Sequence, residues 1–160
     1  MEVIKVVPRG YCKGVINAIQ LAKKTAQLHP DTPIYVLGML VHNSYVMRAL
    51  KELHIYPVDD KAKTRLELLD EIDEGIVIFT AHGISPAVKE KAAQKGLQCV
   101  DASCPDVMKT QDIVTEQLKK GCDVLYIGKP HHPEAEAVVS LSAKVHLIST
   151  EKDVEQLPAM

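Results

Sequence analysis

Two cysteines of this chain occur in the same local pattern, at the end of an apolar run where a turn opens a helix. Cys12 follows the run at residues 3–7, and Cys104 follows the run at residues 98–100. At a helix N-terminus, the free amide groups and the helix dipole favour the thiolate, which binds metals and attacks electrophiles. The sequence therefore predicts reactive or metal-binding thiols at both positions.

Three histidines stand at comparable positions, because each closes an apolar strand. His42 follows Cys12 by 30 residues, His132 follows Cys104 by 28, and His82 ends a separate, continuous apolar strand. Open α/β sheets bind their ligands at the carboxyl ends of the strands. A lone turn histidine more often only caps a helix, but three at equivalent positions favour one crevice that holds an anion.

Glu134 lies two residues after His132, at an expected helix start. Two interpretations stay open from the pattern alone. The carboxylate either stabilises the helix through the dipole, which is common, or donates a proton in a reaction next to His132.

The other two cysteines are predicted to be buried and inert. Cys99 lies on an apolar strand and Cys122 follows a helix stop, and small buried thiols are usual in such places. Cys12 and Cys104 are single cysteines rather than Cys-x-x-Cys pairs, which does not support a zinc ribbon. Single thiolates that converge from different parts of a chain suit an iron–sulfur cluster with one iron open to substrate.

Strands and helices alternate along the chain, which is typical of an α/β fold with mainly parallel sheets and flanking helices. We expect two pseudo-repeated lobes, residues 1–96 and residues 97–160, with the second incomplete at its C-terminal end. The expected strands are residues 3–7, 34–37, 55–58, 76–79, 98–100, 124–127 and 145–148, and the expected helices are residues 15–27, 86–94 and 108–120, with others beginning near 44 and 133.

Composition narrows the classes of function. With 160 residues, 46% apolar content and a net charge of −2, the chain can bury a core and offers no basic face for nucleic acid or anionic membranes. No apolar run approaches the roughly 18 residues that cross a bilayer, and the N-terminus lacks the layout of a signal peptide. We therefore expect a soluble, cytoplasmic protein with no membrane or nucleic-acid partner.

Five short motifs occur in a specific order along essentially the whole chain. They resemble the 4-hydroxy-3-methylbut-2-enyl diphosphate reductases (LytB family), which catalyse the last step of the non-mevalonate isoprenoid pathway. The motifs are Arg9-Gly10-Tyr11-Cys12, Val41-His42-Asn43, Ala81-His82-Gly83, Asp101-Ala102-Ser103-Cys104-Pro105 and His132-Pro133-Glu134.

The resemblance implies a [4Fe–4S] cluster on three cysteines, an allylic diphosphate substrate, and an electron donor such as ferredoxin or flavodoxin. Two electrons and two protons then remove the substrate hydroxyl as water, giving isopentenyl and dimethylallyl diphosphates. By motif, Cys12 and Cys104 resemble two cluster ligands. His42, His82 and His132 resemble the histidines that contact the substrate. His132 and Glu134 resemble the catalytic residues, and Glu134 resembles the glutamate that delivers the proton.

Length is the main departure from the family, whose members have about three such lobes and carry the third cysteine in the later half. We therefore expect a fragment that lacks the third cluster ligand, is inactive alone and self-associates through an incomplete sheet edge. Two other classes stay open. One is a phosphate-binding α/β module without redox activity, and the other is a regulatory protein that binds zinc through cysteines and histidines.

Overall fold

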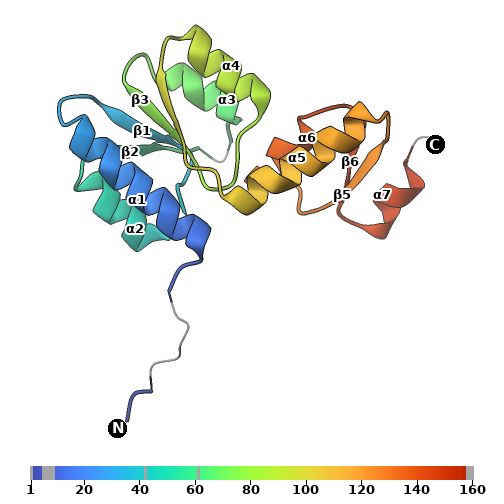
Figure 1. Cartoon of the computed structure of the whole chain (residues 1–160), viewed down its shortest axis with the longest axis horizontal. Helices are drawn as coiled ribbons and strands as arrows, with labels where there is room; N and C mark the ends of the chain where they lie inside the picture. Colours follow the sequence, from blue (N-terminus) through green and yellow to red (C-terminus); the bar gives the residue numbers. More distant parts are fainter. Residues whose placement is uncertain (1, 5–9, 42, 61, 158–160) are drawn as a thin grey trace.

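The structure, a computed structural model, describes residues 2–4, 10–41, 43–60 and 62–157. Four parallel strands form the larger sheet in the order β2-β1-β3-β4, and two parallel strands, β5 and β6, form a separate sheet (Figure 1). This confirms the predicted α/β fold with parallel sheets. The strands are β1 (Ile34–Leu37), β2 (Ile55–Val58), β3 (Ile76–Phe79), β4 (Gln98–Asp101), β5 (Val124–Ile127) and β6 (Val145–Ile148).

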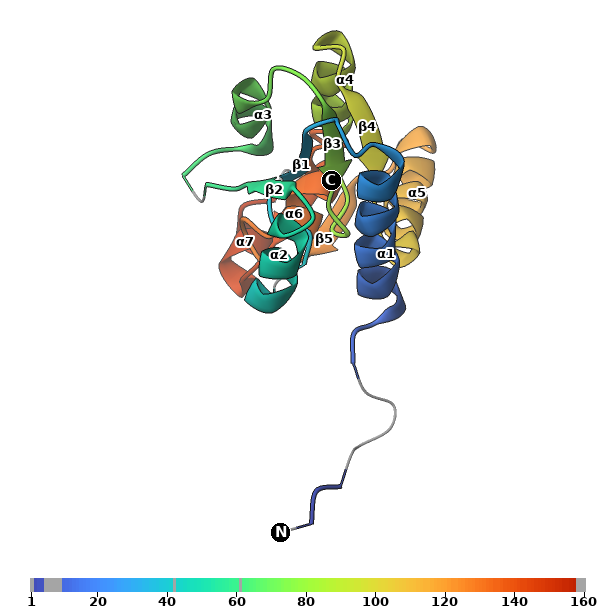
Figure 2. The ribbon, with the colours of Figure 1, turned by 90° about the vertical axis from the view of Figure 1, so that its left-hand side faces the viewer.

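Helices cover both faces of the larger sheet, as expected for a parallel sheet whose central strand is apolar throughout. All four residues of β3 are buried, and its two faces contribute to two separate cores. Figures 1 and 2 show one pair of helices on each side of these strands. One face carries α1 (Lys13–Leu28) and α2 (Ser44–Lys51), and the other carries α3 (Arg65–Leu68), the 3-10 turn η1 (Leu69–Glu71) and α4 (Pro86–Gln94).

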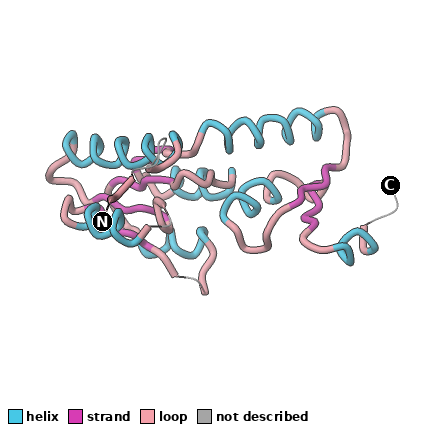
Figure 3. The backbone as a smooth tube through the Cα atoms, turned by 90° about the horizontal axis from the view of Figure 1, so that it is seen from below, coloured by secondary structure: helices cyan, strands magenta, loops and turns pink. Residues whose placement is uncertain are grey.

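The second sheet is smaller than the first. Its core is built on Val114, Val138 and Val145, where α5 (Pro105–Lys119) and α6 (Pro133–Val139) meet the strands. A last short helix, α7 (Glu151–Glu155), contacts β6. Figure 3 shows α5 running along the molecule from the first sheet to the second.

Most expected elements are present, but two details differ. Residues 2–4 carry no strand, and residues 5–7 of the strand expected at 3–7 lie outside the described residues. Strand β4 pairs with β3, so it belongs to the first sheet although its residues were assigned to the second lobe. The division into two lobes at residue 96 stays a prediction.

The expectation that Cys99 and Cys122 are buried is wrong, because both are exposed. Among the described residues β4 is an edge strand, and Cys122 lies in the loop after α5. Partial burial still raises the pKa of the Cys99 thiol, and the nearby Asp101 charge adds to this. A thiol held in its neutral form is a poor nucleophile.

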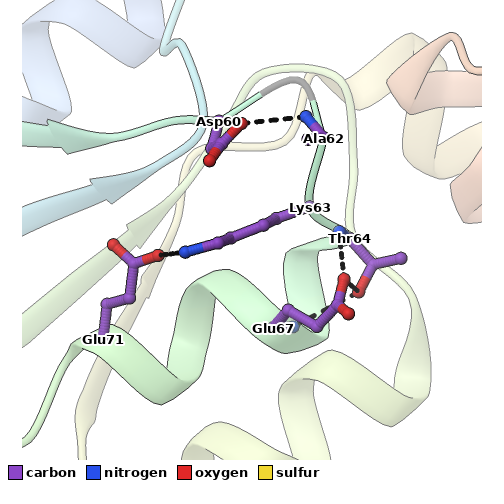
Figure 4. Close-up of polar contacts among 6 residues, drawn as sticks. All are labelled: Asp60, Ala62, Lys63, Thr64, Glu67 and Glu71. Carbon is purple, nitrogen blue, oxygen red and sulfur yellow. Dashed lines mark hydrogen bonds and ion pairs between the residues drawn. The ribbon is translucent and has the colours of Figure 1, made fainter.

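Helix α3 is short and is stabilised at its start by a capping box (Figure 4). The Thr64 side chain accepts a hydrogen bond from the Glu67 amide, and the Glu67 carboxylate accepts one from the Thr64 amide at 2.7 Å. This reciprocal pair satisfies donors that a helix N-terminus leaves without partners. Lys63 adds an ion pair with Glu71 at 2.6 Å across the same segment.

Replacing Thr64 with alanine removes the capping side chain and should lower the free energy of unfolding by about 1 kcal/mol. Thr64→Ser keeps the hydroxyl and should lose only a few tenths of that value. Chemical denaturation of the three proteins measures the difference. Equal stability of the alanine and serine variants would show that the capping bond contributes nothing.

Candidate functional site

Cys12 and Cys104 occupy the same structural position, the N-cap of a helix. Cys12 precedes α1 and Cys104 precedes α5, each with an extended backbone. Neither side chain caps its helix, and both thiols are free of disulfide bonds. The sequence repeat therefore corresponds to a real structural equivalence of the two thiols.

A glycine brings the two helix starts together. A Cβ atom at Gly14, in the first turn of α1, would lie 2.6 Å from the Cys104 sulfur. Such an approach is too short for any real Cβ, so glycine leaves the room that the sulfur occupies. The N-terminal ends of α1 and α5 are correspondingly close in Figure 1.

A pocket of about 310 Å³ opens beside these helix starts. Its walls come from α1, α5, α6 and the turn after β3, so it lies at the carboxyl end of β3. The polar and small residues that line it are Cys12, Gly14, Ala81, His82, Cys104, Asp106, Thr110 and Glu134. The structure thus places both repeat cysteines, one strand-end histidine and the candidate glutamate around one pocket.

The turn after β3 carries His82 into this pocket. His82 Nδ1 lies 3.2 Å from a carboxylate oxygen of Glu134, and the side chains are 16% and 39% exposed. His132 meets His82 edge to face, with ring centroids 5.6 Å apart. His132 is also the N-cap of α6, where its Nδ1 accepts a hydrogen bond from the Glu134 amide.

The same turn is tied to the Cys104 segment. The Cys104 amide donates to the Ala81 carbonyl at 2.9 Å, which continues the ladder between β3 and β4. Gly83 has a φ of +83°, and a Cβ there would lie 2.9 Å from Val107 of α5. A glycine is therefore required both by the backbone angle and by the close approach of the turn to α5.

Asp101 shapes the turn that leads to Cys104. Its carboxylate accepts hydrogen bonds from the amide and the hydroxyl of Ser103, and it pairs with Lys89 at 2.7 Å. Partial burial alone would raise the pKa of Asp101. The bonds from Lys89 and Ser103 outweigh it and hold the pKa below its ordinary value.

The described residues offer two thiols at the pocket and no third ligand. No group of three His, Cys, Asp or Glu side chains in this part of the chain is close enough to share a metal ion. Cys122 lies beyond the far end of α5, a helix about 22 Å long, and Cys99 does not line the pocket. His42 lies outside the described residues.

A larger pocket, of about 440 Å³, lies elsewhere, between the C-terminal ends of α1 and α2. His29 and His54 line it together with Lys23 and Glu52. His54 is exposed and His29 is half-buried. None of the repeat cysteines or strand-end histidines lines this pocket.

Sequence patterns located the cysteines, His82, His132 and Glu134, but they missed three residues that position them. Gly14 and Asp101 carried usable signals, a small residue in the first helical turn and an Asp-x-Ser turn before Cys104. Arg65, which bonds to the His82 turn, gave no local signal, because its partners lie 15 and 18 residues further along the chain.

The fold and site define an α/β protein with parallel sheets and a cysteine- and histidine-lined pocket at the strand ends. The chain belongs to the LytB protein family, whose model matches residues 3–160. In the described part of the chain, no helix has the length and apolar character needed to cross a membrane.

Named relatives agree with this family. The chain is 52% identical over 160 residues to 4-hydroxy-3-methylbut-2-enyl diphosphate reductase of Anoxybacillus flavithermus and 50% identical to that of a Geobacillus species. Each match covers 98% of this chain and 50% of the relative. The chain thus spans about half the length of the curated relatives that it matches.

A solved structure shows the same fold. The E-1-hydroxy-2-methyl-but-2-enyl-4-diphosphate reductase of Plasmodium falciparum superposes with a TM-score of 0.84 at 32% identity, over 96% of this chain and 46% of the other. A second reductase, described as the terminal enzyme of the non-mevalonate pathway, gives 0.78 at 30% identity. The predicted family is therefore confirmed.

The low pKa of Asp101 predicts a pH-dependent contribution to stability. A carboxylate whose pKa is lowered by folding stabilises the native state above its unfolded pKa of about 3.9, and this stabilisation is lost as the pH falls through the folded pKa. Asp101→Asn should therefore be less stable than the original protein at pH 7. The gap should narrow steadily below about pH 4.

Urea denaturation at pH 7 and at several values below pH 4 measures this gap. Asp106→Asn, near Cys104 but without the Lys89 and Ser103 bonds, is the matched control. A gap between Asp101→Asn and the original protein that does not change with pH would contradict the prediction.

Proposed function

We propose that this chain contributes half of the active site of an iron–sulfur reductase that removes the hydroxyl of 4-hydroxy-3-methylbut-2-enyl diphosphate. The observation that carries the proposal is the pocket where Cys12, Cys104, His82 and Glu134 meet. Family membership and the names of the relatives supply the substrate class. The products are isopentenyl and dimethylallyl diphosphates, and two electrons and two protons release the hydroxyl as water.

The residues present fit a [4Fe–4S] cluster in part. Cys12 and Cys104 supply two thiolates from two helix N-termini, and Gly14 leaves space next to one sulfur. A third thiolate at this pocket is not among the described residues. When bound, such a cluster would supply electrons and Lewis-acid chemistry.

The chain's own polar groups would bind the diphosphate and supply a proton. His82 presents an imidazole at the pocket, and His132 lies against it, so both can donate hydrogen bonds to anionic oxygens. Glu134 is held 3.2 Å from His82, a geometry that allows a proton to pass between the carboxyl group and the imidazole. His42 belongs to the same substrate-binding set.

Three further parts of the proposal concern partners and setting. Each turnover needs two electrons, so the enzyme requires an electron donor. A small electron carrier such as ferredoxin or flavodoxin would fill this role. A cytoplasmic location fits a reaction between soluble metabolites and carriers. No part of the proposal requires nucleic acid or membrane.

Anaerobic incubation of the chain with iron and sulfide tests the cluster assignment. We expect a weakly held, brown, EPR-active species that is lost in Cys12→Ser and in Cys104→Ser, since each serine removes a strong iron ligand. Cys99→Ser and Cys122→Ser are matched controls and should keep the signal.

Other outcomes would support the alternatives. Tight zinc binding with tetrahedral cysteine and histidine ligands would favour the regulatory zinc protein. Binding of inorganic pyrophosphate that is unchanged in Cys12→Ser, with no cluster under any condition, would favour a phosphate-binding module without redox chemistry.

We also propose that the smaller sheet mediates self-association. In the described residues β5 and β6 pair only with each other, and Leu125 and Ile127 of β5 are 47% and 84% exposed. An apolar strand with unpaired backbone groups is a template for pairing with another copy.

Sedimentation of the chain over a wide concentration range tests this association. We expect a concentration-dependent dimer or larger species, and a shift to monomer in Ile127→Lys, which places a charge on the exposed face. Ile113→Lys on α5, also an exposed apolar position, is the control. A stable monomer at high concentration would overturn this part of the proposal.

A further inference from the structure

A half-buried arginine lies behind the His82 turn. Arg65 begins α3, and its guanidinium donates to the Gly83 carbonyl at 2.7 Å and to the Thr80 hydroxyl at 3.2 Å. These two acceptors stand on either side of His82 in the chain. Thr80 is fully buried, so its bond to the guanidinium lies in the protein interior.

The environment of Arg65 shows that its place depends on these bonds. Burial lowers the pKa of Arg65, and the more distant charges of Glu136 and Asp59 offset this only in part. In the described residues no carboxylate lies within ion-pair distance of it. A partly buried guanidinium without such a partner is stabilised by hydrogen bonds to neutral acceptors, and both of these acceptors belong to the turn.

We propose that Arg65 is a positioning residue that fixes the His82 imidazole for binding the diphosphate group. The inference rests on the proposed function for the role of His82. It adds a residue outside the pocket, which acts through the turn and touches no substrate. One bond holds the Thr80 side chain before His82 and the other holds the Gly83 backbone carbonyl after it, while Glu134 meets the imidazole from the pocket side.

The two-point geometry matters more than the charge. A guanidinium offers planar donors in a fixed fork and can bond to two acceptors at once, whereas an ammonium group acts as a point charge. Lysine at position 65 would keep the positive charge but would hold the turn at one acceptor at most. Methionine would keep much of the side-chain volume and remove both bonds.

Lys95 provides a matched control. Its ammonium group donates to the Leu69 carbonyl at 2.9 Å, so it also ties α4 to the α3 region through one charged bond to a backbone oxygen. Neither Lys95 nor its acceptor lines the pocket. Lys95→Met should therefore change overall stability without changing the His82 turn.

Two measurements test the proposal on the chain as it is. Calorimetry gives the affinity for inorganic pyrophosphate, and NMR hydrogen exchange follows the amides of Gly83 and Cys104, whose hydrogen bonds hold the turn. We expect Arg65→Met to weaken pyrophosphate binding by about tenfold. Arg65→Met should also speed hydrogen exchange at both amides more than at the amides of β1 and β3. Arg65→Lys should show intermediate affinity and exchange, and Lys95→Met should leave exchange at the turn unchanged.

A double variant separates positioning from general effects. If Arg65 acts through His82, Arg65→Met should weaken pyrophosphate binding far less in a His82→Gln background than in the original protein. Equal effects in both backgrounds would overturn the proposal. So would an Arg65→Lys variant that matches the original protein in both affinity and exchange.

A different binding result is expected if His82 does not bind the diphosphate group, that is, if the proposed function is wrong. In that case pyrophosphate binding would be absent or insensitive to His82→Gln in the otherwise unchanged chain. The exchange measurement still decides the structural part, because unchanged exchange at Gly83 and Cys104 in Arg65→Met would show that Arg65 does not hold the turn. If Arg65→Met fails to fold, the same exchange criterion applies to Arg65→Lys.

Discussion

The pocket depends on how one short turn is held. After β3, Ala81 accepts a hydrogen bond from the Cys104 amide, His82 meets Glu134, and Gly83 accepts a bond from Arg65. Three successive residues are thus tied to the starts of α5, α6 and α3. Because β3 is buried on both faces and cannot shift, the turn has a fixed origin and three fixed contacts.

This arrangement explains why residues distant in sequence share one pocket. Parallel pairing brings the carboxyl ends of neighbouring strands to one edge, and each helix then starts at that edge. Cys12 and Cys104 are the N-caps of two such helices, and Gly14 allows their close approach. The reductase chemistry that we propose therefore uses the part of the fold where helix N-termini gather.

Periodicity and turn residues allowed most of the fold to be predicted. The continuous apolar strand at β3, the Ser85-Pro86 start of α4 and the thiols before α1 and α5 are local signals, and the structure matches them. The features that could not be predicted from the sequence depend on tertiary structure. Cys99 carries an apolar strand pattern, yet among the described residues it lies on an edge strand, where it stays exposed. The role of Arg65 was also hidden, because its partners are brought near only when α3 packs against the face of β3.

The membership of β4 in the first sheet and of α5 in the second core has a consequence for synthesis on the ribosome. The larger sheet needs only the residues up to Asp101, whereas the apolar side of α5 at Val114 is covered only after β6 ends at Ile148. At about 5–20 residues per second, the roughly 50 residues between these points take about 2–10 s to emerge. For that interval a finished first lobe carries an uncovered helix that begins at Cys104. An early contact between that helix start and Gly14 would hold the nascent helix against folded protein rather than leave it free to aggregate.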